Sequence, residues 1–232
     1  MYKYLSVVFL VLLFISFSCK KDKTDKNISY YHVSNFVCID GLLDSDNESI
    51  VMIGTTNVSG KDVNIGIVKI NKTTGNIIWN KNYGGINTEK GIRIQATSDG
   101  YLIAAIANNA IGQPFDILLM KIDMNGNELW EHAVGGSADE AVGNMAIKSN
   151  GNIIIAGTAK SFGAGDRDVI LFETDANGIE IQHKTFGGTG LDGATDLIYN
   201  ANTYYALAYT TSIGNGDRDI WLMAFDEALD TI

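Results

Sequence analysis

Short apolar runs, each four to eight residues long and divided by Gly, Asn, Asp and Ser, recur from about residue 34 to residue 232. From Ser29 onward no segment of ten or more residues shows the 3.6-residue apolar period of an amphipathic helix. Short apolar runs between turn-forming residues are typical of strands joined by tight turns. The pattern therefore predicts an all-β fold.

The runs are also ordered in a repeat. The stretch DILLMKIDMNGNELWEHAVGG, residues 116–136, has approximate copies at 64–85 and 168–188, and a fourth copy begins at Asp219. The glycine pairs that close the copies start at Gly84, Gly135 and Gly187, which are 51 and 52 residues apart. A fixed period of this size indicates a repeat architecture.

Each period contains up to four strand candidates. In the second copy they are 91–96, 101–107, 116–122 and 127–134. In the third copy they are 141–148, 152–158, 168–174 and 179–186. The fourth copy supplies 194–199, 204–210 and 219–225, and its fourth strand is missing.

The distribution of apolar and polar residues on the strands predicts how the sheets are arranged. The second and third strands of a copy are apolar on both faces, so each sheet must be covered on both sides. The fourth strand is polar and belongs at an exposed edge. Like sheets that cover one another predict a β-propeller of four-stranded antiparallel blades with a repeat of 51–52 residues. The repeats are 34–85, 86–136, 137–188 and an incomplete 189–232.

The number of blades stays open at this stage. Four blades close into a ring if residues 29–33, SYYHV, supply the missing outer strand of the last blade. Alternatively, the chain is part of a longer array of six to eight blades, or the product of a truncated gene. The last residues, 226–232, match the start of a further strand and favour an incomplete array.

The first residues differ from the rest. Residues 1–18 carry Lys3 and an apolar run too short to span a bilayer, which is typical of an export signal. Ser18 before Cys19, followed by the charged stretch KKDKTDKN, resembles the lipobox of bacterial lipoproteins. The resemblance implies acylation of Cys19, a polar tether over 19–28 and a folded region over 29–232. Cys38 then lacks a disulfide partner, and we expect it to be a small core residue.

A second resemblance concerns the repeats. NKTTGNIIW (71–79) and DMNGNELW (123–130) are similar to the tryptophan-docking repeat of quinoprotein-like propellers. In that superfamily a turn with glycine precedes a tryptophan that wedges between blades. The phrases GDRDVILFETDANG and GDRDIWLMAFDE resemble propeller repeats of exported bacterial lipoproteins. The third copy has Gln182 where Trp79 and Trp130 stand.

Charge and motifs restrict the chemistry. Without Lys3 the chain has 16 basic and 27 acidic residues, a net charge of −11, which disfavours nucleic acid. Gly188, Gly190 and Gly193 spell GxGxxG, but no helix is expected after them to hold a phosphate. The three histidines are too few and too scattered for a metal cluster. The sequence thus predicts no catalytic residue, no metal and no cofactor.

The polar loops between strands are the candidate ligand surface. Their residues lie in the Asp-Arg-Asp turns, after the glycine pairs, and in the loop NNAIGQPF, which departs from the repeat. Repeated acids at such positions are usually turn caps, a structural role that we weigh against ligand binding. Tyr204 and Tyr205 add possible stacking surface. The candidate loop residues are Gln113, Phe115, Asp139, Glu140, Asp166, Arg167, Asp192, Asp217 and Arg218.

Two functions from different classes follow. The first is a lipoprotein, exported to the bacterial outer membrane or cell surface, whose propeller binds a protein or a glycan. The second is a quinoprotein-like or polysaccharide-processing enzyme with a site at the channel mouth, for which Asp139 and Asp192 are the candidate carboxylates. The repeat platform and the lack of a catalytic motif favour the binding module.

Overall fold

The computed structural model describes residues 33–57, 63–85, 87–108 and 112–232. Residues 35–232 form one compact unit. The predicted export signal, Cys19 and the tether lie outside the described residues, as does most of the segment 29–33. In the described part no helix is long and apolar enough to cross a membrane.

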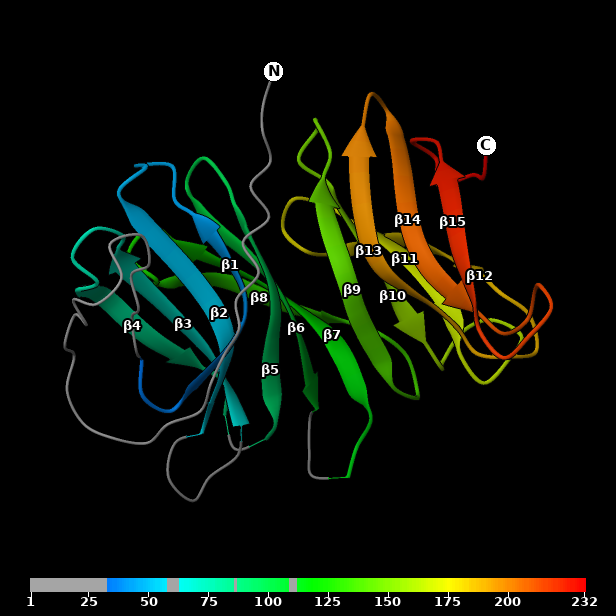
Figure 1. Cartoon of the computed structure of the whole chain (residues 1–232), viewed down its shortest axis with the longest axis horizontal. Helices are drawn as coiled ribbons and strands as arrows, with labels where there is room; N and C mark the ends of the chain where they lie inside the picture. The colour runs from blue at the N-terminus through cyan, green and yellow to red at the C-terminus, as the bar shows by residue number, and fades with distance from the viewer. Residues whose placement is uncertain (1–32, 58–62, 86, 109–111) are drawn as a thin grey trace, which may run out of the picture. The chain divides into compact units, whose positions relative to one another are not determined.

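Fifteen strands form four antiparallel sheets, each made of consecutive strands (Figure 1). The first contains β1 (Phe36–Leu43), β2 (Ser49–Asn57), β3 (Val63–Asn71) and β4 (Ile77–Tyr83). The second contains β5 (Glu89–Ala96), β6 (Gly100–Asn108), β7 (Phe115–Asp123) and β8 (Glu128–Val134). The third contains β9 (Glu140–Ile147), β10 (Ile153–Ala159), β11 (Asp168–Thr174) and β12 (Glu180–Phe186). The fourth contains β13 (Asp192–Asn200), β14 (Thr203–Thr210) and β15 (Asp219–Phe225).

The all-β prediction is confirmed, and so is the division into four-stranded blades. The last sheet has three strands, as the sequence predicted. After β15 a turn brings Thr231 into a bridge with Phe225, and the Ile232 N–H donates to the Ala224 carbonyl at 3.0 Å. The final residues therefore begin to pair with β15.

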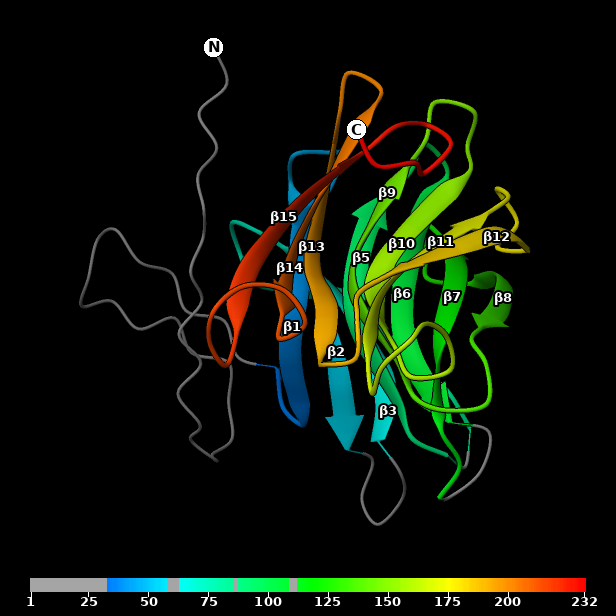
Figure 2. The same ribbon diagram turned by 90° about the vertical axis from the view of Figure 1, so that its right-hand side faces the viewer.

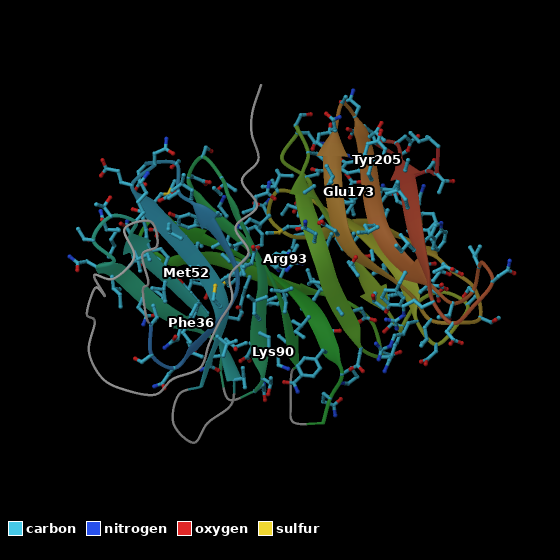
Figure 3. All side chains as sticks on the ribbon, in the orientation of Figure 1. Phe36, Met52, Lys90, Arg93, Glu173 and Tyr205 are labelled. Atoms are coloured by element: carbon cyan, nitrogen blue, oxygen red, sulfur yellow. The ribbon has the colours of Figure 1, made fainter. Side chains whose placement is uncertain are left out.

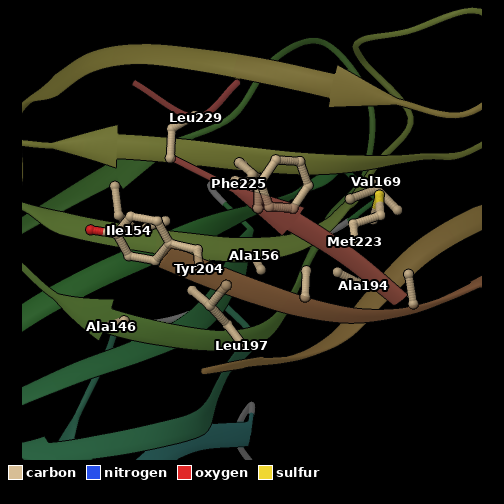
Figure 4. Packing of buried hydrophobic residues seen from close by; sticks show 13 residues of the cluster. Ala146, Ile154, Ala156, Val169, Ala194, Leu197, Tyr204, Met223, Phe225 and Leu229 are labelled. Carbon is tan, nitrogen blue, oxygen red and sulfur yellow. The ribbon is translucent and has the colours of Figure 1, made fainter. Parts of the chain in front are cut away.

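Three apolar layers separate the four sheets, which explains why the second and third strands are apolar on both faces. The layers are centred on Ile67 and Ile103, on Leu119 and Phe172, and on Ile154, Tyr204 and Phe225. Figure 4 shows the last layer, between the third and fourth sheets. Strands β1, β5, β9 and β13 are the first strands of their sheets, and each packs on the next in that series (Figure 2). We call them the inner strands.

The fourth strands are the exposed edges that the sequence predicted. In β4, β8 and β12 most side chains are exposed or half-buried. Trp79 on β4 donates its indole N–H to the Met124 carbonyl of the second sheet at 3.2 Å. A Cβ atom on Gly178 of the third sheet would lie 2.6 Å from the Trp130 ring. The two tryptophans therefore lie between neighbouring sheets, as predicted.

The third junction uses different residues at the same places. Gln182 replaces the tryptophan and donates to Glu173 at 2.8 Å. Leu229, with φ of 62° and no exposed surface, replaces the turn glycine of the following sheet. Lys184 closes this junction by donating to the Ala228 carbonyl at 2.9 Å and to Asp230 at 2.6 Å. Tryptophan and glycine have thus been exchanged together at this junction.

Candidate functional site

The acids that follow the glycine pairs are structural braces. Glu140 is 2 % exposed and accepts the N–H groups of Gly136 at 2.9 Å and Ser161 at 3.2 Å. Asp192 is fully buried and accepts the Gly188 N–H at 2.9 Å and the Ser212 hydroxyl at 2.6 Å. Such bonds hold the turn between two sheets, and they leave neither carboxylate open to a ligand.

A glycine is required where these acids meet the preceding sheet. At Gly187, with φ of 159°, a Cβ atom would lie 2.1 Å from Asp168 and 2.6 Å from Asp192. At Gly135 it would lie 2.3 Å from Asp116 and 2.7 Å from Glu140. The glycine pairs found in the sequence therefore make room for two acidic side chains at each of these junctions.

Two negative charges would lie close together at the junction where Asp116 meets Glu140, which is electrostatically unfavourable. Burial, together with the neighbouring Glu140 carboxylate, raises the pKa of Asp116. The Oδ1 atom of Asp116 is buried and has no hydrogen-bond partner among the described residues. The first repeat has the neutral Asn64 at this position. The pair is a folding feature of the junction rather than an acid–base pair at a surface.

Asp139 is also bound into the fold. It accepts the Phe115 N–H at 3.1 Å and the Lys160 ammonium group at 3.1 Å, and these bonds lower its pKa. Phe115 is half-buried at the start of β7, with the Lys90 ammonium 5.7 Å from its ring centre. Asp139 and Asp192 therefore each brace a loop, and neither resembles a free catalytic carboxylate.

The remaining loop candidates are exposed. Gln113, Asp166 and Asp217 project from their turns, and Arg218 lies over the Tyr209 ring at 4.3 Å. Arg167 contributes its backbone, whose carbonyl accepts the Asp192 N–H at 2.8 Å. These residues come from loops of different sheets. The structure brings none of their side chains into a shared hydrogen bond or ion pair among the described residues.

Two further expectations need correction. Tyr204 is fully buried in the layer between the third and fourth sheets, because successive residues of a strand face opposite ways, and only Tyr205 remains exposed. Cys38 is half-buried, and its thiol donates to the Asp40 carbonyl at 3.4 Å. Burial and the nearby Asp40 carboxylate raise the pKa of this thiol, so it is a poor nucleophile.

A groove along the inner strands gathers polar groups from all four sheets. Its cavity measures about 590 Å³. Every inner strand has a β-bulge at the same level, where the register with its neighbour shifts. A bulge inserts one unpaired residue and re-aims the side chain beside it. The side chains that follow the bulges line the groove, which we call the inner groove, and they are Asp40, Arg93, Asn144 and Asp196.

Three of the four groove residues cap the backbone. Asp40, Asn144 and Asp196 each accept the N–H of the following residue at 2.8 Å. Asp40 also accepts the Ile94 N–H of the next inner strand at 3.1 Å, and Asn144 donates to Asp196 at 2.5 Å. These bonds tie neighbouring inner strands together and fix the orientation of the side chains.

Arg93 is the exception. It follows the bulge of β5, where Figure 3 labels it, and its guanidinium group donates to the adjacent Ile92 carbonyl at 3.0 Å. Among the described residues it forms no ion pair. A guanidinium group has five N–H donors, so most donors of this half-buried side chain have no acceptor among the described residues. The inner groove thus offers a fixed positive charge between capped acidic and amide side chains.

Sequence reasoning missed the inner groove. Asp40, Arg93, Asn144 and Asp196 follow one another at intervals of 53, 51 and 52 residues, so the repeat period contained the signal. A bulge adds one residue inside a strand but leaves the length of the repeat period unchanged. It therefore cannot be recognised from the apolar pattern of the strand. In the described part of the chain, no group of three or more His, Cys, Asp or Glu side chains is arranged to hold a metal ion.

Comparison with known proteins supports the fold and little else. No family model matches the chain. Regulatory protein FlaEY of Caulobacter vibrioides is 22% identical over 184 residues, which cover 66% of this chain and 19% of FlaEY. The solved structure of dihydro-heme d1 dehydrogenase NirN in complex with DHE has a TM-score of 0.50 and 13% identity. That match covers 88% of this chain and 39% of NirN. Together with the four antiparallel sheets, it shows a β-propeller-like fold.

Proposed function

We propose that this protein is an exported lipoprotein whose propeller-like unit binds a protein or glycan ligand in the inner groove. The observation that supports the proposal is the variation at the four bulges. The same β-bulge occurs on each inner strand, and the polar side chains that follow it line a single cavity of about 590 Å³. These side chains are Asp40, Arg93, Asn144 and Asp196. A rigid scaffold that carries different polar side chains at equivalent places suits recognition.

Arg93 suggests the chemistry of the ligand. A guanidinium group binds a carboxylate through two parallel N–H bonds, and such charge-assisted bonds are stronger than neutral ones. The flanking Asn144 amide and the carboxylates of Asp40 and Asp196 accept or donate to hydroxyl and amide groups. The groove therefore fits a polar ligand with a carboxylate, either an acidic glycan or an acidic segment of a protein.

The membrane attachment in this proposal depends on Cys19. The apolar run before it and the polar stretch 20–27 after it support acylation at that residue and export to the outer membrane or cell surface. Metabolic labelling with a palmitate analogue tests this part. Cys19→Ala should abolish incorporation and release the protein from the membrane fraction, whereas labelling that persists in this variant would refute the anchor.

The ligand can be tested on the purified protein with an array of neutral and acidic glycans and a pull-down from cell-surface extract. Arg93→Gln should weaken binding of the captured ligand by about tenfold or more, because a charged hydrogen bond contributes about 1.5–3 kcal/mol. Arg218→Gln is the matched control, since Arg218 lies on an exposed loop over Tyr209. Equal losses in the two variants, or no ligand at all, would count against the inner groove.

The same preparation distinguishes the enzymatic alternative. If the protein were a quinoprotein-like enzyme, addition of pyrroloquinoline quinone and calcium would give a stoichiometric bound chromophore. We expect no such complex, because Asp139 and Asp192 are engaged by backbone groups, Ser212 and Lys160.

A further inference from the structure

A second cavity, of about 700 Å³, lies between the second and third sheets at the end where β5 turns into β6. We call it the side pocket. Its apolar wall includes Leu102, Trp130 and Ile153. Its polar side chains come from β5 and the turn after it, from β7, and from the turn after β11. They are Gln95, Thr97, Ser98, Asp99, Lys121 and Asn177.

The residue at one repeated position explains where the side pocket opens. Near the start of the second strand of a sheet, the strand register makes Tyr101, Ile153 and Tyr204 equivalent. Tyr101 and Tyr204 are fully buried in the first and last of the three apolar layers, and Figure 4 labels Tyr204. In the middle layer Ile153 stands at this position and has neither the ring nor the hydroxyl group. The side pocket thus opens at the junction that lacks the tyrosine.

The missing hydroxyl group leaves a buried lysine with one partner fewer. At the first junction the Tyr101 hydroxyl accepts the Lys69 ammonium group at 3.3 Å. Lys121 occupies the position of Lys69 in the second sheet, and its side chain is 12% exposed. It donates to Thr97 at 2.5 Å and to Asp99 at 2.6 Å. Because an ammonium group has three N–H donors, one donor of Lys121 has no acceptor among the described residues, and Lys121 lines the side pocket.

We propose that the side pocket binds a neutral hexose unit between the second and third sheets. A six-membered ring fits the place that a tyrosine ring takes at the other two junctions. The ligand is neutral because Lys121 and Asp99 already balance each other's charge. A phenol offers one hydroxyl group, whereas polar side chains on several strands and turns suit the many hydroxyl groups of a sugar. The Trp130 indole then packs on the apolar face of the ring.

The side pocket is a different site from the inner groove, although the two cavities meet. Gln95 and Ile147 line both of them. Arg93 lines the inner groove and not the side pocket, whereas Lys121 and Ile153 line the side pocket and not the inner groove. The hexose site therefore does not depend on an acidic ligand at Arg93, and variants at these residues separate the two.

The site is tested on the full chain, purified in a detergent without a sugar headgroup. The probes are the methyl glycosides of glucose, galactose and mannose, with p-cresol as a phenol, and titration calorimetry measures their dissociation constants. Ile153→Tyr restores the tyrosine of the other two junctions, so it should fill the side pocket and weaken the bound glycoside by about tenfold or more. The matched control is Ile50→Tyr, the same change at the equivalent position of the first sheet, which does not line the pocket and should leave the affinity unchanged.

A second variant keeps the test independent of the new tyrosine. Lys121→Met retains most of the aliphatic stem and removes the ammonium group, so it should weaken the same glycoside by about tenfold, whereas Arg93→Gln should not change its affinity. Circular dichroism checks the fold of each variant, and Lys121→Met carries the test if Ile153→Tyr does not fold. The proposal is overturned if none of the three glycosides binds at millimolar concentration, if both side-pocket variants bind as well as the natural chain, or if p-cresol binds in preference to the sugars.

Discussion

A buried ion pair in the third sheet offers a direct test of how the repeat is built. Glu173 on β11 accepts hydrogen bonds from Lys148 at 3.1 Å, Asn152 at 2.8 Å and Gln182 at 2.8 Å. The side chains of Lys148 and Glu173 are 9% and 6% exposed. In the first two sheets the charges are reversed. There Lys69 and Lys121 occupy the position of Glu173 and pair with Asp44 and Asp99 in the first turn.

We predict that Glu173→Lys destabilises the protein by about 3–5 kcal/mol, the usual cost of leaving a buried charge without its partner. The additional change Lys148→Asp should recover at least half of this loss, because it recreates the orientation of the Lys69–Asp44 pair, in which the aspartate stands at the position of Lys148. Recovery should be incomplete, since Glu227 lies 3.2 Å from Lys148 and would repel the new aspartate. A double-mutant cycle of urea unfolding curves, followed by circular dichroism, measures the coupling.

Two results would refute this reasoning. The first is a loss below about 0.5 kcal/mol in Glu173→Lys, which is the range of ordinary surface substitutions. The second is a double variant no more stable than the single one, which would mean that the orientation is not interchangeable between sheets.

The dependence of stability on acid pH gives an independent check. Burial opposes ionisation of Glu173, but the bonds from Asn152, Gln182 and Lys148 prevail and lower its pKa. Its contribution is therefore present above the unfolded-state pKa and is lost as the pH falls, and Glu173→Gln should remove this part of the acid dependence.

Three further predictions concern the junctions between sheets. Asp116→Asn should raise the melting temperature more at pH 8 than at pH 4, because a raised folded-state pKa gives a contribution that is lost as the pH rises through that pKa; a uniform shift at both values would contradict it. Gly178→Ala should lower the free energy of urea unfolding by about 1–3 kcal/mol, because φ is 81° and the new Cβ atom would lie 2.6 Å from Trp130. Gly112 has a similar φ of 80° but open space around it, so Gly112→Ala should lower this free energy only by the backbone strain of about 1–2 kcal/mol. Phe172→Ala, which empties the layer between the second and third sheets, should cost about 3–5 kcal/mol, and a value near that of an exposed residue such as Ile181→Ala would show that the layer can collapse.

The strands and the sheet architecture could be predicted because they depend on local pattern. The predicted strands 168–174 and 219–225 are β11 and β15 themselves, and the other predicted strands differ from the observed ones by one or two residues at their ends. Apolar runs on both faces predicted sheets covered on both sides, and three apolar layers do so. The polar fourth strands were correctly placed at exposed edges.

The candidate site was harder to predict because side-chain roles depend on contacts between sheets. The sequence around an acid such as Asp192 does not show whether its carboxylate faces solvent or accepts hydrogen bonds from Gly188 and Ser212. Tyr204 and Tyr205 could have been separated by strand alternation alone, since only one of two adjacent residues can face the core. The bulges at Asp40 and Asp196 needed the register of paired strands, which no single strand reveals.

Changes between repeats fall into two kinds, and the difference supports a ligand role for Arg93. At structural positions the changes come in compensating pairs. Gln182 and Leu229 replace a tryptophan and the glycine that it covers, and Glu173 and Lys148 exchange charges within one ion pair. Arg93 changes without such a partner, because no acid in the described residues pairs with its guanidinium group. A half-buried charge that the described residues do not compensate is costly to keep, which agrees with our proposal that its partner is a ligand in the inner groove.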